Sequence, residues 1–518
     1  MKIDFFNKYK YKIKNLNSLI RILKNNKDRK KSVMCHGVFD VVHPGHIRHL
    51  AFAKSKADIL IVSITADKHI KKGKYRPHVP QLLRALNLAA FEMVDFVLID
   101  NNKKPLTNIS KIKPNFFAKG FEYSKSNMPV ETKEEIEVIE KFGGKMIFTP
   151  GDIVYSSSNM LNLSLPDLKY EKLLMLMKIN NLSFLKLKKV VNDLSKFKVH
   201  VIGDTIVDTH TYTKMIGGQT KTPTISVLFE KEKNYVGGAG IVSMHLKSAG
   251  AKVIFSTVLG NDKLKKLVLK KLKEFKIDTK YQIEKLRPTT NKNVIISQGY
   301  RMLKLDTLDN KPISQKTLTT FSNEIKKTKA DAYVFSDFRH GLFNRDNIKF
   351  LFDSLPNKSF KVADSQVASR WGNICEFENF DLVTPNEKEA RFATGEQDTT
   401  VKSLTRSIFE KSHPKNIILK LGSKGIYSTH FAKNEENTFA FSIDSFVDKN
   451  VDPVGAGDAL LAYSTLTFLK TKSLLISSII GSLAAACECE IDGNIPIKPS
   501  DIIEKINSIS QKIKFKIK

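Results

Sequence analysis

Several kinds of residue and segment are scarce in this sequence of 518 residues. Its four cysteines, Cys35, Cys375, Cys487 and Cys489, are too few and too scattered for a disulfide scaffold. Its longest apolar stretch, residues 473–487, contains several serines and is shorter than the roughly 18 to 20 residues that cross a bilayer. The N-terminus mixes lysines with apolar residues and has no signal-peptide core. We therefore expect a cytoplasmic protein without a membrane span.

Acidic residues are few relative to basic ones. Lys and Arg total 85, whereas Asp and Glu total 53, so the formal net charge is +32. Such an excess is typical of proteins that bind nucleic acid or anionic membranes. The lysines, however, are spread along the whole sequence and do not gather on one element beside stacking aromatic residues. We expect small phosphorylated ligands, and no nucleic acid, as partners; a polyanion-binding patch is the alternative.

The order of apolar segments predicts an α/β protein of two domains. The length and the 41% content of hydrophobic residues are sufficient for domains with their own cores. Strand and helix patterns alternate over residues 31–163 and again over residues 196–518, which is typical of parallel, doubly wound sheets. The remaining segments are a helical extension at 1–30, a helical linker at 164–195 and, early in the second domain, half-exposed strands of a small β lid at 210–214 and 224–229.

Two histidines follow the first predicted strand of the first domain. His43 and His46 are three residues apart, and Pro44 suits the first position of a helix, so both imidazoles project near a helix N-terminus. The free N–H groups and the positive end of a helix attract anions there. The pattern predicts a site for a phosphate chain, whereas a lone histidine would be more typical of a structural residue.

This segment resembles the signature of the HxGH nucleotidylyltransferases, which have a cytidylyltransferase-like, Rossmann-like fold, and the resemblance covers residues 31–163. It implies that His43, His46 and Lys72 are catalytic. The nucleotide- and phosphate-binding residues that it implies are Gly37, Phe39, Asp40, Arg76, Arg84, Lys119, Ser156, Ser157 and Ser158. From the residues alone, the loop from Lys72 to Arg76 can also be a solvated basic loop, and the serines can be a simple helix N-cap.

A second motif with chemistry lies near the end of the second domain. In the segment Asp452-Pro-Val-Gly-Ala-Gly-Asp458, the backbone amides of Gly455, Ala456 and Gly457 precede a predicted helix and can form an anion hole for a phosphoryl group. Asp458 can accept the proton of an attacking hydroxyl. A glycine-rich turn with a capping aspartate is the structural alternative.

This motif resembles the signature of the ribokinase/PfkB carbohydrate kinases, and the likeness spans residues 197–498. The resemblance implies a ribokinase-like domain in which Asn386 and Glu389 organise Mg²⁺ and the triphosphate, with Glu389 as the metal residue. The substrate-binding residues that it implies are Asp204, Asp208, Gly237, Gly238, Lys292 and Asp452. Buried or capping roles are the alternative for these residues.

Further segments, residues 219–227, 287–292 and 302–306, resemble the bifunctional heptose 7-phosphate kinase/heptose 1-phosphate adenylyltransferases. In a familiar form of that enzyme the kinase comes first, whereas here the nucleotidylyltransferase comes first. At two places the sequence differs from the usual pattern of these kinases, and the residues concerned are ones that contact the sugar or lie near the phosphates. Ile241 replaces an asparagine that contacts the sugar, and Asp364-Ser365-Gln366 stands where these kinases usually have Asp-Pro-Lys.

The resemblance implies two reactions with ATP and Mg²⁺. The second domain would phosphorylate C1 of a sugar phosphate, expected to be D-glycero-heptose 7-phosphate. The first would join a sugar 1-phosphate to AMP from ATP, releasing pyrophosphate; a separate phosphatase would act between the steps. One alternative keeps both reactions but uses another sugar, or CTP as the nucleotide donor. The other is a non-catalytic protein that binds a sugar, a nucleotide or a polyanion. Kinase relatives also imply a homodimer formed through the lid strands.

Overall fold

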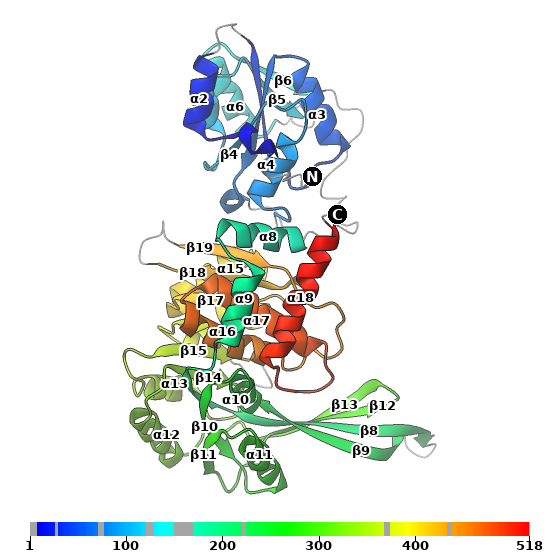
Figure 1. The fold of residues 1–518 in the computed structure, drawn as a ribbon, viewed down its shortest axis with the longest axis vertical. Helices are drawn as coiled ribbons and strands as arrows, with labels where there is room; N and C mark the ends of the chain where they lie inside the picture. Colours follow the sequence, from blue (N-terminus) through cyan, green and yellow to red (C-terminus); the bar gives the residue numbers. More distant parts are fainter. Residues whose placement is uncertain are drawn as a thin grey trace. The chain divides into compact units, whose positions relative to one another are not determined.

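The computed structural model describes residues 8–25, 30–70, 77–120, 128–149, 169–219, 224–366, 373–432 and 438–516. The chain divides into two compact units, residues 1–167 and 168–518 (Figure 1). Both are α/β, as predicted. No helix among the described residues is long and apolar enough to pass through a lipid bilayer.

The first unit contains a parallel sheet of six strands in the order β1-β4-β3-β2-β5-β6. The order reverses at β2, because β3 lies on one side of it and β5 on the other, and ligands bind beyond the carboxyl ends of strands at such a switch point. The segment before residue 30 contributes the short strand β1 as well as a helix. The strands are β1 (Ile13–Lys14), β2 (Ser32–Gly37), β3 (Ile59–Thr65), β4 (Phe96–Asp100), β5 (Phe116–Gly120) and β6 (Lys145–Thr149).

Helices cover both faces of this sheet, because successive residues of a buried strand point to opposite sides. Val33 and Cys35 of β2 pack in one core cluster with Leu50 and Leu88, whereas Met34 packs in the other with Leu19. The first cluster lies under α3 (Pro44–Lys54) and α4 (Gln81–Ala89), and the second lies under α2 (Leu16–Lys24), α5 (Leu106–Ile112) and α6 (Val130–Glu140). The unit also contains two short 3-10 helices, η1 (Lys10–Lys12) and η2 (Asp67–His69).

The second unit is built on a sheet of nine strands in the order β11-β10-β7-β14-β15-β16-β17-β18-β19. Its strands are parallel from β11 to β17, so their carboxyl ends share one edge of the sheet, whereas β18 runs antiparallel to both of its neighbours, β17 and β19. The strands are β7 (Lys198–Gly203), β10 (Lys252–Leu259), β11 (Asp278–Ile283), β14 (Ala332–Asp337), β15 (Phe360–Ser365), β16 (Leu382–Val383), β17 (Asn416–Lys420), β18 (Ile426–His430) and β19 (Phe439–Ile443).

Two hydrophobic clusters flank this sheet. Val334 faces the first cluster, and its neighbours Tyr333 and Phe335 face the second. Residues of the segment predicted as a linker form α8 (Lys169–Ile179) and α9 (Phe184–Asn192), which pack in the first cluster. That cluster also lies under α10 (Ala239–Ser248), α11 (Lys263–Glu274), α16 (Ala456–Thr471), α17 (Leu474–Cys489) and α18 (Pro499–Lys516). The second cluster lies under α12 (Gln315–Lys327), α13 (Arg345–Phe352), α14 (Glu387–Thr394), α15 (Val401–Ser412) and the 3-10 helix η4 (Ile374–Glu376). A further 3-10 helix, η5 (Gly422–Lys424), follows β17.

A separate sheet of four strands projects from the second unit as an arm (Figure 1). Its order is β13-β12-β8-β9, and it contains both segments predicted to form a lid. Each residue of the edge strand β13 is exposed. The strands are β8 (Thr205–Gln219), β9 (Thr224–Gly238), β12 (Asn291–Ser297) and β13 (Tyr300–Thr307), and we call this sheet the lid.

Candidate active sites

The two histidines of the first unit meet at the start of α3, beyond the carboxyl end of β2. His43 is the N-cap, and its Nδ1 accepts a hydrogen bond from the Gly45 amide at 3.2 Å. The rings of His43 and His46 are stacked with their centroids 3.8 Å apart. Burial, together with the charges of His43 and His49, lowers the pKa of His46 to about 4, and burial also lowers the pKa of His43. Both rings are therefore neutral at pH 7 before a phosphate binds.

Phe39 lies in the turn between β2 and α3. Its φ of 49° is unusual for a residue with a side chain, and its ring centroid lies 5.0 Å from that of His46. A Cβ at Gly37 would lie only 3.0 Å from the Phe39 ring. A side chain at position 37 would therefore press on the ring that packs beside the histidines.

Asp40 and Arg84 hold the segments around the histidines. Asp40 accepts hydrogen bonds from the amides of His78 (3.1 Å) and Val79 (2.9 Å). Arg84 is fully buried and donates to backbone carbonyls and to one carboxylate. Its acceptors are the carbonyl oxygens of Val38, Thr65 and Val79 and the carboxylate of Asp67. These contacts fix the loop after β2, and the phosphate contact expected of Arg84 stays a prediction.

Lys119 lies near the end of β5, and its side chain contacts polar side chains of α6. Its ammonium contacts the carboxylate of Glu135 and donates to Thr132 Oγ1 at 2.9 Å. The sequence did not point to His49, whose Nδ1 lies 2.7 Å from Thr149 Oγ1 at the end of β6. The predicted residues Lys72, Arg76, Ser156, Ser157 and Ser158 lie outside the described residues.

The predicted anion hole of the second unit lies at the start of α16. Gly455 is the N-cap with a φ of 87°, and a Cβ there would meet Asn494 Oδ1 at 2.3 Å, so only glycine fits. Ala456 and Gly457 are the first residues of the helix, where N–H groups lack intrahelical partners. Asp458 follows and is buried; its burial and the charge of Asp364 raise its pKa well above the usual value.

Asp208 lies on the lid side of this site. Its Oδ2 accepts a hydrogen bond from Asn494 Nδ2 at 2.7 Å, and a Cβ at Gly237 would clash with the same oxygen at 2.1 Å. Burial raises the pKa of Asp208 to about 6, while the positive charge of Lys292 opposes the shift. Asp458 feels the charges of both Asp208 and Lys292. The structure therefore brings together predicted residues that are about 250 positions apart in the sequence.

Asp204 has internal partners. Its carboxylate accepts hydrogen bonds from the amides of Phe338 (3.0 Å) and His340 (3.3 Å). Gly238 has a φ of 59°, and a Cβ there would lie 2.5 Å from the Asp204 carbonyl oxygen. These contacts fix the turn after β14 beside the site.

Basic side chains surround His340 on this turn. Burial and the charges of Lys292, Arg287 and Lys304 lower the pKa of His340 to about 3. Both ring nitrogens of His340 are buried without a hydrogen-bond partner among the described residues. Arg287 itself donates to the carbonyls of His340, Asp309 and Lys311. The result is a positively charged wall around a neutral His340, which we call the basic cluster and define as Arg287, Lys292 and Lys304.

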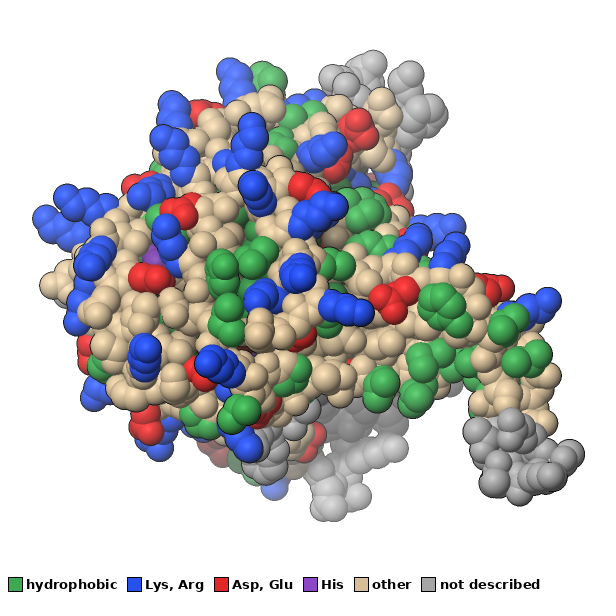
Figure 2. All heavy atoms as spheres, turned by 90° about the horizontal axis from the view of Figure 1, so that it is seen from below, with side chains coloured by type: hydrophobic (Ala, Val, Ile, Leu, Met, Phe, Trp, Pro, Cys, Tyr) green, Lys and Arg blue, Asp and Glu red, His purple; other side chains and the backbone are tan. Residues whose placement is uncertain are grey.

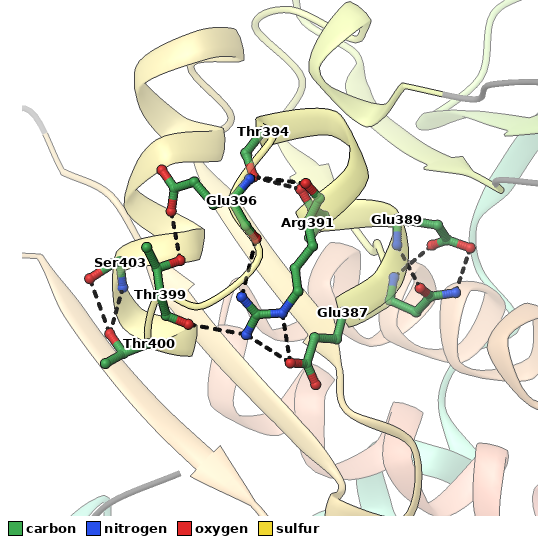
Figure 3. Close-up of polar contacts among 10 residues, drawn as sticks. Glu387, Glu389, Arg391, Thr394, Glu396, Thr399, Thr400 and Ser403 are labelled. Atoms are coloured by element: carbon green, nitrogen blue, oxygen red, sulfur yellow. Dashed lines mark hydrogen bonds and ion pairs between the residues drawn. The ribbon is translucent and has the colours of Figure 1, made fainter. Parts of the chain in front are cut away.

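Asn386 and Glu389 form a capping box at the start of α14 (Figure 3). The Glu389 carboxylate accepts from the Asn386 amide at 2.6 Å and from Asn386 Nδ2 at 2.5 Å. One turn further, Arg391 donates to Glu387 and to the carbonyls of Glu396 and Thr399, which anchors the helix end (Figure 3). Burial raises the pKa of Glu389 to about 7, with Lys420 opposing the shift.

Some polar residues of the second site were not found from the sequence. Glu488 reads as part of an apolar helix, yet its Oε1 lies near Gly455, 2.9 Å from where a Cβ would stand. Asp452, expected to bind substrate, pairs with Arg301 of the lid at 3.0 Å. Lys420 forms an ion pair with Asp364 at 2.8 Å. These contacts join segments that are distant in the sequence, and no local motif signals them.

Glu488 provides a prediction about pH and stability. Its burial, followed by the charges of Asp458 and Asp452, raises its pKa to about 8. Because the unfolded chain releases this proton near pH 4.5 and the folded chain holds it, the stability of the second domain should fall as the pH rises from 4.5 to 8. Glu488→Gln should therefore gain on the order of 3 kcal/mol over the wild type between pH 5 and pH 8.

Urea unfolding of the two proteins across this pH range measures the effect. Glu504→Gln, at an exposed position of α18, is the matched control and should follow the wild type. An equal pH dependence of Glu488→Gln and the wild type would contradict the assignment.

The two folds and sites define a nucleotidyltransferase-like domain followed by a sugar-kinase-like domain, and comparison with known proteins identifies both. Residues 196–500 match the pfkB family carbohydrate kinase model, and residues 34–161 match the cytidylyltransferase-like model. The first match covers more than half of the chain, so the chain belongs to the pfkB family of carbohydrate kinases. The predicted domain types and their order are confirmed.

Curated relatives include proteins named bifunctional protein HldE. The one from Campylobacter jejuni strain RM1221 is 44% identical over 117 residues, 22% of this chain and 25% of that protein. The one from Sulfurimonas denitrificans is 26% identical over 311 residues, 59% of this chain and 64% of that protein. This chain thus matches less than two thirds of their length. The longer alignment has more residues than the first unit, so it includes residues of the second.

Solved structures of low sequence identity share the fold of the second unit. Phosphofructokinase-2 from Escherichia coli in complex with substrates and products has a TM-score of 0.51 at 14% identity, covering 60% of this chain and 99% of that chain. The same enzyme in complex with potassium has a TM-score of 0.51 at 15% identity, covering 61% and 99%. They bear out the predicted ribokinase-like fold.

Proposed function

We propose that this protein is a bifunctional enzyme of sugar-nucleotide synthesis. Its second domain transfers the γ-phosphoryl group of ATP to C1 of D-glycero-heptose 7-phosphate, giving ADP and the 1,7-bisphosphate. Its first domain joins the heptose 1-phosphate to AMP from ATP, giving ADP-heptose and pyrophosphate. The relatives named bifunctional protein HldE support this assignment, as do the carbohydrate kinase and cytidylyltransferase-like models that match the two regions of this chain.

The observation that carries the kinase assignment is that Asn494 joins Asp208 to the start of α16. Its Nδ2 donates to Asp208 Oδ2 at 2.7 Å, and its Oδ1 lies 2.3 Å from where a Cβ of Gly455 would stand. Asp208 is placed to accept from a sugar hydroxyl, and Asp458 to accept the proton of the attacking hydroxyl. The basic cluster lies next to them and supplies the positive charge that a second phosphate on the sugar requires. A phosphorylated sugar therefore suits the site better than an uncharged one.

In the first domain the reaction needs no covalent intermediate. An oxygen of the sugar 1-phosphate attacks the α-phosphorus, and pyrophosphate leaves, so the protein must align two anions and stabilise the charge that develops. His43 and His46 supply imidazole donors at a helix N-terminus, where the dipole favours anions. We propose that Lys72, Arg76, Lys119 and Ser156 to Ser158 complete this phosphate site, and that Gly37 and Phe39 line it.

Mg²⁺ fits the second site as a partner of the triphosphate. Among the described residues, no three His, Cys, Asp or Glu side chains meet in a group that could hold a metal. Glu389 and Asp364 interact electrostatically at the sheet edge, and one or two carboxylates with phosphate oxygens are the usual ligands of Mg²⁺. We propose that Glu389 binds the ion through water. When bound, the Mg²⁺ ion neutralises charge on the triphosphate. We propose a cytoplasmic location, because both proposed reactions consume ATP.

A second candidate function keeps the fold and replaces ATP by CTP in the first domain. The family model that matches residues 34–161 is cytidylyltransferase-like, which favours this possibility. Pyrophosphate release from ATP and from CTP, each tested with a panel of sugar 1-phosphates, separates the two. We expect release only with ATP and heptose 1-phosphate; release with CTP alone would replace the adenylyltransferase assignment.

The lid supports a homodimer. All eight residues of β13 are exposed, and apolar side chains line the projecting arm (Figure 2). Such a surface is rarely left open to water. We propose that two copies pair through their lids, so light scattering should give about twice the chain mass of 58.6 kDa. Leu303 and Leu305 are 59% and 56% exposed, so Leu303→Lys/Leu305→Lys should yield monomers.

Leu185→Lys, at an exposed leucine of α9, is the control for the lid variant and should remain dimeric. A wild-type protein of single-chain mass at micromolar concentration would contradict the dimer.

A further inference from the structure

A buried lysine lies at the kinase site in a place that the motifs did not indicate. Lys420 is the last residue of β17, at the edge of the sheet where β15 and β16 also end. The segment that ends β15, Asp364-Ser365-Gln366, carries no lysine. Lys420 therefore supplies a positive charge next to Asp364 from another strand, with a side chain that is only 14% exposed.

The surroundings of Lys420 are acidic. Its Nζ donates to Asp364 Oδ1 at 2.8 Å, and the same oxygen accepts from Thr384 Oγ1 at 2.8 Å. Burial disfavours the charged lysine, but the carboxylates of Asp364 and Glu389 outweigh it, so the pKa of Lys420 is raised and the ammonium remains charged. Asp458 is also within its electrostatic reach. The cation thus stands among the carboxylates of the proposed base and the proposed metal residue.

The ammonium also lies beside the anion hole. A Cβ built on Gly457 would meet Lys420 Nζ at 3.3 Å and its Cδ and Cε at 3.9 Å, and these are the three nearest atoms. An anion that accepts a hydrogen bond from the first amides of α16 therefore lies within reach of Nζ. Asp364 occupies one of the three N–H donors, and an ammonium can offer the others to phosphate oxygens.

We propose that Lys420 is a catalytic residue of the kinase domain that binds the equatorial oxygens of the transferring phosphoryl group. This inference rests on the proposed kinase activity. The bond between the sugar oxygen and the γ-phosphorus forms while the bond from that phosphorus to ADP breaks. Asp458 takes the hydroxyl proton, and ADP leaves. Lys420 keeps its proton and stabilises the negative charge on the equatorial oxygens.

The alternative is that Lys420 only neutralises Asp364, and a double variant separates the two roles. We expect Lys420→Met to lower kcat for sugar phosphorylation about 100-fold or more, with KM for the sugar changed less than threefold. Lys420→Arg should restore part of the loss. Lys420→Met/Asp364→Asn should remain about 100-fold below Asp364→Asn alone. Lys415→Met, on the exposed start of the same strand region, is the matched control.

Nucleotide binding gives a readout that does not depend on turnover. Calorimetry on the full chain in a His43→Ala/His46→Ala background confines binding to the kinase domain. Lys420→Met should weaken a non-hydrolysable ATP analogue at least about tenfold and ADP less than threefold, because the contact is to the γ-phosphate.

Equal losses for both nucleotides, or a double variant as active as Asp364→Asn, would overturn the assignment of Lys420. A wild-type chain that binds the analogue with this Lys420 dependence but phosphorylates no sugar would instead refute the proposed function.

Discussion

Asp458→Asn is expected to lower kcat for sugar phosphorylation by about 10³-fold while leaving nucleotidyl transfer by the first domain unchanged. The carboxylate is buried at the start of α16, and Asp364 and Asp208 help to raise its pKa, so it is poised to accept a proton from the attacking hydroxyl. Asparagine keeps the shape but accepts no proton. Coupled detection of ADP release, with the sugar phosphate saturating, measures the loss.

The pH dependence of the same assay adds a second readout. Because the pKa of Asp458 is raised, the wild-type rate should increase with pH as this group ionises, and the residual rate of Asp458→Asn should not follow that limb. Asp353→Asn, at the exposed end of α13, is the matched control. A variant within tenfold of the wild type, about 1.4 kcal/mol of barrier, would contradict the general-base role.

His46→Ala is expected to lower nucleotidyl transfer by about 10² to 10³-fold, about 2.7 to 4 kcal/mol, without an effect on the kinase reaction. The ring of His46 stacks on His43 and lies beside Phe39 at the helix N-terminus, where phosphate oxygens would collect. His46 is a sharper choice than His43, because His43 also caps the helix and its loss would weaken α3. Pyrophosphate release measures the effect.

Ile47→Ala, at a partly exposed position on the same helix, controls for general damage to α3. The kinase rate of the His46→Ala protein reports on the second domain in the same sample. Loss of both reactions together would show misfolding, and a nucleotidyl-transfer rate near that of the wild type would exclude His46 from the reaction.

Contiguous motifs predict both candidate sites from the sequence. The residues from Gly455 to Asp458 are neighbours in the chain, and the helix that follows them fixes their geometry, so the sequence order already describes the anion hole. The same holds for His43 and His46. The α/β architecture was likewise predictable, because strands buried on both faces read as apolar runs between amphipathic helices.

What sequence reasoning missed depends on contacts between distant segments. Lys420 reaches the site only because β17 lies next to β16 in the sheet, and nothing near position 420 signals a phosphate. Glu488 is hidden in an apolar helix that is typical of a core. Arg84 also makes contacts that its motif does not indicate, because its guanidinium donates to buried carbonyl groups; its phosphate contact stays a prediction.

The short strand β1 was missed for a different reason. It has two residues, too few for an alternating pattern to be visible, and pairing with β4 determines its conformation. The identity of the sugar is also beyond the local pattern, because the candidate substrate residues come both from the lid and from segments of the second unit outside it. The basic cluster narrows the choice to phosphorylated sugars but does not distinguish among their stereoisomers.

The most direct test of the account is mass spectrometry of the products that the purified chain makes from ATP, Mg²⁺ and D-glycero-heptose 7-phosphate. The account predicts a heptose 1,7-bisphosphate from the chain alone and ADP-heptose once a phosphatase that removes the 7-phosphate is added. Asp458→Asn should stop the first product, and His46→Ala only the second. A mixture in which heptose 7-phosphate is unchanged, while the same sample phosphorylates another sugar, would contradict the heptose assignment.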